Sequence, residues 1–250
     1  MKKVIKPADP LIALQEYTAA RIAIGRAGTS IPLKQSLEFK LAHAHARDAV
    51  YSALAVEALT VRLKQFELPV LHLHSMAGYR EQYLQRPDLG RKLSQESVTE
   101  LAHGATPADI AVIIADGLSA IAINTNVIEL LELLIPMLRF AGFTLADIVL
   151  VEQGRVAIGD EIASALRARL SLVLIGERPG LSSADSVGAY LTYNPKPGLT
   201  DELRNCVSNI RPQGLTYKQA SKKIFYLVQE AFRRKLSGVA LKDNAGSLHE

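Results

Sequence analysis

Short apolar runs rich in Val, Ile and Leu alternate with longer amphipathic stretches along the last two thirds of the chain. Such runs are typical of strands that are buried on both faces of a parallel sheet. They lie at residues 70–75, 109–117, 147–154 and 170–177, with a further candidate at 189–195. Helical spacing marks the segments 94–103, 124–140, 160–168 and 216–236. This alternation predicts an α/β fold, with a Rossmann-like, doubly wound and mostly parallel sheet.

The first 67 residues follow a helical pattern instead. Residues 11–24 and 33–67 are predicted helices, and the turn-rich segment GRAGTSIP separates them. We therefore divide the chain into a small helical N-terminal domain, residues 1–67, and a Rossmann-like domain, residues 68–250. At the far end of the chain, Thr216 and Gly238 are expected to cap the last helix.

The composition is that of an ordinary globular protein, because 48% of the 250 residues are hydrophobic. No stretch approaches the ~20 apolar residues of a membrane-spanning helix, so no membrane is expected. The basic start MKKVIK is followed by Pro7, Asp9 and Pro10, where a signal peptide would continue with an apolar core. Cys206 is the single cysteine, so no internal disulfide forms and we expect a cytoplasmic protein.

The net charge of +4 is unevenly distributed. Residues 100–150 hold six acidic side chains and one basic one, so the rest of the chain carries the basic excess. Such asymmetry can mark a nucleic-acid surface. The last predicted helix carries Lys222, Lys223, Arg233, Arg234 and Lys235. Because no run of five basic residues occurs, a solvated surface is the favoured interpretation and no nucleic-acid partner is expected.

Ligands are expected at the loops that follow the predicted strands, because the carboxyl ends of parallel strands gather at one edge of a sheet. These loops lie at 115–119, 152–156 and 177–186. Neither the G-x-G-x-x-G fingerprint of dinucleotide-binding folds nor the P-loop pattern occurs. A generic Rossmann-like protein that binds a nucleotide or another small ligand stays open as an alternative, without a local motif in its support.

The most informative loop is GERPGLSSADS, which directly follows a predicted strand. Its Pro179 and two glycines give an irregular backbone that a simple connection does not need. Glu177 lies at the carboxyl end of the strand, where ligand groups are usually met. A local ion pair with Arg178 would explain the same carboxylate without any ligand.

Cys206 and two histidines are the remaining candidates for chemistry. Arg204 lies close to Cys206 and could lower the pKa of the thiol, but no histidine base occurs in that segment, which favours a structural thiol. His72 and His74 alternate on a predicted strand and face the same side, as two metal ligands can. No other Cys or His stands near them, so we assign neither a metal site nor a catalytic residue.

Seven segments of the chain follow the order in which one known family carries them. They are RIAIGRAG (21–28), LAHAHARDAV (41–50), RPDLGRKLS (86–94), ADGLSAIAI (115–123), GRVAIGDEI (154–162), LIGERPGLSSADSVGAY (174–190) and RNCVSNIRPQG (204–214). These segments resemble the small subunit of ethanolamine ammonia-lyase. The similarity spans roughly residues 15–240, and its most specific part is GERPGL followed by RNCxSNI.

The resemblance implies a function, a cofactor and a partner. Ethanolamine ammonia-lyase converts ethanolamine to acetaldehyde and ammonia by a radical mechanism that begins at adenosylcobalamin. Its large subunit, a TIM barrel, binds the substrate, and the small subunit covers the cobalamin from the other side. The family's cobalamin contacts match Val156 in G-R-V, Glu177 in G-E-R-P-G and Cys206 in R-N-C-x-S-N. Whether Cys206 would act through its thiol or its backbone stays open.

Two departures limit what the resemblance implies. The segment HLHSMAG does not match D-x-H-x-x-G, the pattern through which many cobalamin proteins supply a histidine to cobalt, so the cofactor is expected to keep its own base. Some family members have a longer N-terminal extension that is associated with delivery to a bacterial microcompartment. Here ten residues precede the first predicted helix, so we expect a cytoplasmic location, with a microcompartment as the alternative.

Overall fold

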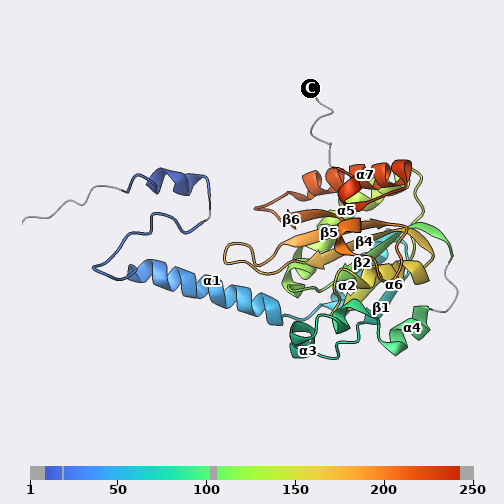
Figure 1. Ribbon diagram of the computed structural model, residues 1–250, viewed down its shortest axis with the longest axis horizontal. Helices are drawn as coiled ribbons and strands as arrows, with labels where there is room; N and C mark the ends of the chain where they lie inside the picture. The colour runs from blue at the N-terminus through green and yellow to red at the C-terminus, as the bar shows by residue number, and fades with distance from the viewer. Residues whose placement is uncertain (1–8, 19, 102–105, 243–250) are drawn as a thin grey trace, which may run out of the picture.

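The computed structural model describes residues 9–18, 20–101 and 106–242, which form one mixed six-stranded sheet with helices around it. The strand order is β1-β3-β2-β4-β5-β6 (Figure 1). The strands are β1 (Val70–His74), β2 (Ala108–Ala115), β3 (Ile148–Glu152), β4 (Ala168–Gly176), β5 (Val187–Tyr193) and β6 (Asn205–Ile210). The first four are parallel, whereas β5 and β6 each run antiparallel to the preceding strand. The predicted α/β class is confirmed.

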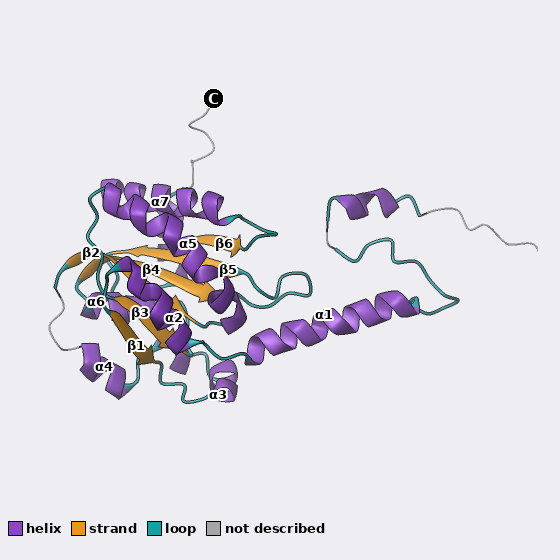
Figure 2. Ribbon diagram, turned by 180° about the vertical axis from the view of Figure 1, so that it is seen from behind, coloured by secondary structure: helices purple, strands orange, loops and turns teal. Residues whose placement is uncertain are grey.

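Alternate side chains of each strand face opposite sides of the sheet and bury two separate cores. In β2, Ile110, Val112 and Ile114 lie in the larger core, and Ala111 and Ile113 in the smaller one. The larger core is covered by α2 (Val56–Leu63), α5 (Ala120–Phe140) and α7 (Tyr217–Arg234), and the smaller by α4 (Gln95–Leu101) and α6 (Ile158–Ala165). Figure 2 views the sheet from the side that α2 and α5 cover.

The helix α5 is the centre of the larger core. Among the described residues, it is the one helix long and apolar enough to cross a membrane by length and composition alone. Eleven of its residues are buried, and it packs against β4 and α7, which explains its apolar composition. Its start is capped by the Ser119 side chain, which accepts a hydrogen bond from the Ala122 N–H. Gly142, at φ +83°, follows its end.

The N-terminal prediction was wrong in two places. Within residues 11–18 and 20–24, the structure has only the short 3-10 helix Ile12–Glu16, none of whose residues is buried. The predicted helix 33–67 is divided into α1 (Leu33–Tyr51) and α2. The division follows from contacts with α5, because Asn124 accepts a hydrogen bond from the Ala55 N–H and donates one to the Ala53 carbonyl. These bonds hold the chain extended between the two helices.

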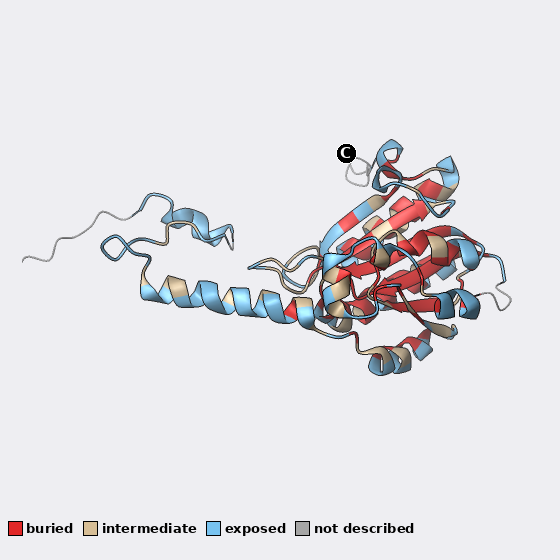
Figure 3. Ribbon diagram, turned by 60° about the horizontal axis from the view of Figure 1, so that its bottom comes forward, coloured by how far each residue is buried: buried red, intermediate tan, exposed pale blue. Residues whose placement is uncertain are grey.

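The helix α1 projects away from the sheet and is mostly exposed (Figure 3). In contrast, α2 belongs to the body of the molecule, because Leu59 and Leu63 are buried in the larger core. The division of the chain at residue 67 stays a prediction, and the structure adds that Leu54 already belongs to the larger core.

Predictions for the last helix were half right. Thr216 begins α7 with a capping box, in which its side chain and that of Gln219 each bond the other's backbone. The end of the helix was misplaced, because Lys235, at φ +58°, is the C-terminal cap. Gly238 serves close packing instead, since a Cβ there would lie 2.0 Å from the Glu202 carbonyl oxygen.

Candidate functional site

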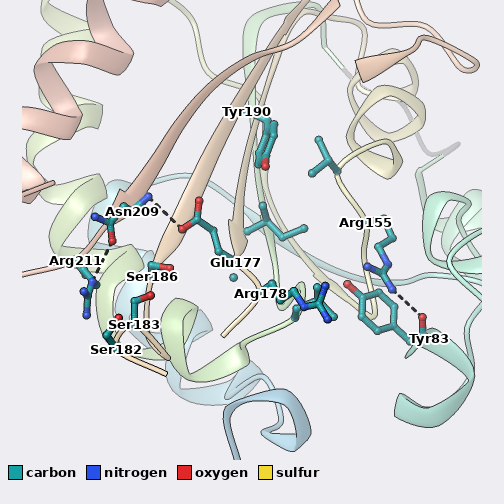
Figure 4. A pocket seen from close by; sticks show the side chains of 14 residues that line it. Tyr83, Arg155, Glu177, Arg178, Ser182, Ser183, Ser186, Tyr190, Asn209 and Arg211 are labelled. Atoms are coloured by element: carbon teal, nitrogen blue, oxygen red, sulfur yellow. Dashed lines mark hydrogen bonds between the residues drawn. The ribbon is translucent and has the colours of Figure 1, made fainter. Parts of the chain in front are cut away.

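A pocket of about 670 Å³ lies at the carboxyl ends of β2, β3 and β4. The strand after β2 in the chain, β3, lies on one side of β2, and the next strand, β4, lies on the other. The loop after β2 leads to α5 on one face of the sheet, and the loop after β3 leads to α6 on the other face. These two loops therefore diverge at this edge, which is where open α/β sheets commonly bind ligands. The pocket is lined by residues of these loops and of their neighbours, among them Leu118, Val156, Glu177, Tyr190 and Arg211 (Figure 4).

Two glycines allow the loops after β2 and β4 to meet at the floor of the pocket. Gly117 has φ +58°, and a Cβ there would lie 2.3 Å from the Gly176 carbonyl oxygen. A Cβ on Gly176 would in turn lie 2.0 Å from the Ser119 carbonyl oxygen. The Leu118 N–H donates to the Gly176 carbonyl at 2.9 Å. Larger residues at either position would separate the two loops.

Glu177 is the first residue after β4 and is partly buried in the pocket wall. Its Oε2 accepts a hydrogen bond from the Asn209 N–H at 3.1 Å. Gly188 provides the space for this carboxylate, because a Cβ there would lie 3.1 Å from Oε1. Among the described residues, Oε1 has no hydrogen-bond partner and Arg178 forms no ion pair with Glu177. The local ion pair that would explain Glu177 without a ligand is therefore absent from this part of the chain.

Val156 lies in the loop between β3 and α6 and lines the same pocket. Its side chain is partly buried against the smaller core. An apolar surface at the pocket wall is thus available beside the carboxylate of Glu177. The structure brings these two predicted residues together in one cavity.

Cys206 lies outside the residues that line the pocket, on β6. It pairs in register with Tyr190 of β5, which does line the pocket. Partial desolvation raises the pKa of the Cys206 thiol, Tyr190 opposes the shift and the charge of Glu177 adds to it. Arg204, which could have lowered this pKa, binds Asp160 and Asp201 instead. The thiol is therefore protonated at neutral pH.

A buried cluster beside the pocket was not predicted. The carboxylate of Asp116 follows β2 and lies 3.6 Å from Nη1 of Arg80, at the start of α3 (Arg80–Gln85). Burial raises the pKa of Asp116 to about 6. Backbone hydrogen bonds from Gln153 and Gly154 and the positive charge of Arg80 oppose this shift. Arg80 also donates to the Gly117 carbonyl at 2.8 Å. This cluster joins the loops after β2 and β3.

Tyr83 and Arg155 form the wall of the pocket nearest to that cluster. Tyr83 is fully buried, and its hydroxyl donates to the Gly154 carbonyl at 3.1 Å. The guanidinium carbon of Arg155 lies 4.1 Å from the centroid of the Tyr83 ring, and that of Arg80 lies 4.7 Å from it. Such stacking orients a planar cation. Nothing in the sequence pattern links Tyr83 to a residue more than seventy positions away.

The histidines considered as metal ligands have other partners. His72 Nε2 lies 2.8 Å from Glu152 Oε1, and His74 Nδ1 lies 2.8 Å from the Ser75 carbonyl oxygen. Within residues 9–18, 20–101 and 106–242, no group of three or more His, Cys, Asp or Glu side chains could hold a metal ion. The pocket at the strand ends thus remains the candidate site.

Comparison with known proteins agrees with the similarity seen in the sequence. Residues 8–242 match the family model of the ethanolamine ammonia-lyase light chain (EutC). The chain belongs to this family. It is 53% identical over 244 residues to an ethanolamine ammonia-lyase small subunit of Xanthomonas campestris pv. campestris, covering 96% of this chain and 89% of that protein. It is 50% identical over 248 residues to the small subunit of Pseudomonas putida, covering 98% and 91%.

Membership of the light-chain family confirms the resemblance on which the function was predicted. Family membership also agrees with the prediction that this chain is a non-catalytic subunit of a lyase. The assignment of Val156, Glu177 and Cys206 to a cofactor rests on matched motifs, and the geometry places the first two of them in one pocket.

Proposed function

We propose that this chain is the small subunit of an adenosylcobalamin-dependent ethanolamine ammonia-lyase, and that it binds cobalamin together with a large TIM-barrel subunit. The complex would convert ethanolamine to acetaldehyde and ammonia by a radical mechanism. The observation that carries this proposal is the pocket at the strand ends, where Val156 and Glu177 lie together. Membership of the light-chain family supplies the reaction, and the relatives' description as small subunits supplies the larger partner.

The residues of the pocket fit a corrinoid. Cobalamin combines a large apolar ring edge with neutral amide side arms, so it needs both apolar surface and hydrogen-bond acceptors. Val156 supplies apolar surface, and Glu177 presents an oxygen without a partner in the described chain. The amide N–H groups of the side arms can donate to that oxygen in charge-assisted hydrogen bonds. The cavity of about 670 Å³ lies within the usual size range of small-molecule sites.

In the proposed mechanism the chain holds the cofactor and does not react. Adenosylcobalamin, when bound, supplies the radical that starts the reaction. Glu177 is fixed by the Asn209 N–H, so its free oxygen is oriented before the cofactor arrives. Val156 excludes water from the ring edge, and β5 and β6 support the wall through the Tyr190–Cys206 pair. We assign no proton transfer to any of these residues.

We further propose a Rossmann-like assignment for the sheet domain, supported by four parallel strands with helices on both faces. The proposed location is the cytoplasm, with a bacterial microcompartment as the alternative. The nucleic-acid interpretation loses support, because Arg233 and Arg234 of α7 both bind Glu230. The generic nucleotide-binding alternative still lacks a motif.

The direct test is ammonia release from ethanolamine in the presence of adenosylcobalamin. We expect turnover when the chain is mixed with the large subunit, and none with either subunit alone. A pull-down shows whether the two subunits assemble. Turnover by this chain alone would contradict its assignment as a non-catalytic subunit, and an assembled but inactive pair that binds no cobalamin would contradict the cofactor.

A further inference from the structure

The charges around the pocket are not balanced. Of the residues that the structure describes, three arginines and one glutamate line it. Arg211 is paired with Asp185, at 3.2 Å, and Glu177 is bound to a backbone N–H. Within the described chain, Arg155 and Arg178 have no acidic partner. The pocket therefore carries an excess of positive charge, which suits a ligand with an anionic group.

Arg155 is held in place far more firmly than Arg178, which is exposed. The guanidinium of Arg155 stacks on Tyr83, and its Nη2 donates to the Tyr83 carbonyl at 3.0 Å. Its backbone N–H donates to the Gly90 carbonyl at 2.7 Å. Gly90 is required for this arrangement, because a Cβ there would lie 2.8 Å from Cγ of Arg155. The side chain is thus oriented before any ligand binds.

This fixed guanidinium retains unused donors. Its Nε is buried and has no hydrogen-bond partner. Its Nη1 has no acceptor among the described residues either. A donor without a partner is costly, so an acceptor from outside the described chain would stabilise this guanidinium. Donors left over on an oriented cation at a pocket wall indicate that a ligand supplies the acceptor.

We propose that Arg155 binds the phosphodiester of the nucleotide loop of cobalamin, an inference that rests on the proposed function. The phosphodiester is the anionic group of this cofactor, and the planar fork of arginine matches phosphate oxygens. Figure 4 shows Arg155 and Tyr83 at one end of the pocket, with Glu177, Asn209 and Arg211 toward the other. The neutral side arms and the anionic loop of one cofactor can therefore bind at separate ends.

The experiment compares three corrinoids on the complex of this chain with the large subunit. They are cyanocobalamin, cobinamide phosphate, which keeps the phosphate but lacks the base, and cobinamide, which lacks both. Binding is measured by equilibrium dialysis, with the visible absorbance of the corrin as the readout. The variants are Arg155→Gln, Arg155→Lys and the matched control Arg86→Gln, which removes a surface arginine paired with Asp88 outside the pocket.

We expect Arg155→Gln to weaken cobalamin and cobinamide phosphate by about ten- to a hundredfold, since charge-assisted hydrogen bonds are lost. The Arg155→Gln complex should bind cobinamide as tightly as the unchanged complex does. The affinity of Arg155→Lys for cobalamin should lie between those of Arg155→Gln and the unchanged complex, because lysine keeps the charge but lacks the planar fork. The control variant should alter none of the three affinities. Assembly of each variant is checked by pull-down.

Three outcomes would overturn the inference. Equal losses for all three corrinoids would assign Arg155 a structural role in the wall. A loss for cobalamin alone would move the contact from the phosphate to the base, and no loss for any ligand would place the phosphate elsewhere. Failure of the proposed function is separate from these, because the unchanged complex would then bind none of the corrinoids.

Discussion

Arg204 and Asp160 form a buried, two-pronged ion pair that joins β6 to α6, with N–O distances of 2.7 and 2.8 Å. Each side chain is only 2% exposed. Asp160 lies four residues after Val156, and Arg204 lies two residues before Cys206. The pair therefore connects the segments of two predicted cofactor contacts that lie far apart in the sequence. Arg204 also donates to Thr192 at 3.1 Å, on the strand β5 that carries the pocket residue Tyr190.

Removal of Arg204 should strongly destabilise the fold. Arg204→Met leaves the Asp160 carboxylate buried without its partner, which typically costs about 3–5 kcal/mol. The double variant Arg204→Met, Asp160→Leu removes both charges and should recover most of that loss. Urea unfolding followed by circular dichroism measures both. If the single variant lost less than about 1 kcal/mol, the pair would be open to water and would not connect the two segments.

Cys206→Ser should leave the complex active. The thiol is protonated at neutral pH, so we expect it to serve neither as nucleophile nor as proton carrier. We expect cobalamin affinity and turnover within about twofold of the unchanged protein, as for other mild surface changes. Loss of turnover with cobalamin still bound would show that the thiol itself takes part.

The same thiol gives an independent check through its pKa. Because the pKa is raised above the ordinary value of 9.0, alkylation by iodoacetamide should keep accelerating above pH 9. Tyr190→Phe removes the hydroxyl that opposes the shift, so the acceleration should move to still higher pH. A rate that levels off at or below pH 8 would contradict the electrostatic surroundings described for Cys206.

Asp116 should make stability fall as the pH rises through about 6. Its folded-state pKa of about 6 exceeds the unfolded value of 3.8, so the folded chain binds the proton more tightly. The contribution is complete below pH 3.8 and is lost as the pH rises through 6. Relative to Asp116→Asn, which does not titrate, the unchanged protein should lose roughly 2 kcal/mol between pH 4 and pH 7. Urea unfolding of both proteins at several pH values measures this difference, and a constant difference would exclude the shifted pKa.

The parallel strands and the position of the pocket could be predicted because buried strands have a simple signature. Runs such as 109–117 are apolar on both faces, and their carboxyl ends define one edge. Glu177 and Val156 could be placed on that edge for the same reason. The strand β6 was missed because only one of its two faces is covered. Cys206, Ser208 and Asn209 are therefore exposed beside buried Val207. An edge strand of this kind has a polar sequence that resembles a loop.

Other features depend on contacts that no local pattern records. The helical spacing of 33–67 is continuous, and it is Asn124, far along the chain, that interrupts it. Similarly, Arg155 is an ordinary loop arginine in the sequence. Its orientation comes from Tyr83 and Gly90, which contact Gly154 and Gln153 in the loop after β3. Only the folded chain distinguishes it from an exposed arginine such as Arg178.

Glu177 should determine how tightly the cofactor is held and leave the chemical step unchanged. Its Oε2 is occupied by the Asn209 N–H, so a ligand would meet Oε1. Loss of a charge-assisted hydrogen bond costs roughly 1.5–3 kcal/mol, so Glu177→Ala should weaken cobalamin binding by about ten- to a hundredfold. Turnover at saturating cofactor should change much less, because a contact made equally in the ground and transition states does not alter the barrier.

Two further variants separate this role from a purely structural one. Glu177→Gln keeps an acceptor for the Asn209 N–H but removes the charge, so it should preserve stability and still weaken cobalamin binding. Arg86→Gln changes a surface arginine that is paired with Asp88 outside the pocket, so it should have no effect on affinity. Cofactor titrations of activity in the two-subunit complex, with a pull-down for assembly, give the readout. Because cobinamide retains the amide side arms, Glu177→Ala should weaken it as much as cobalamin, unlike a change at Arg155. Unchanged affinity for both corrinoids in an assembled complex would show that Glu177 serves only to hold β6 against the end of β4.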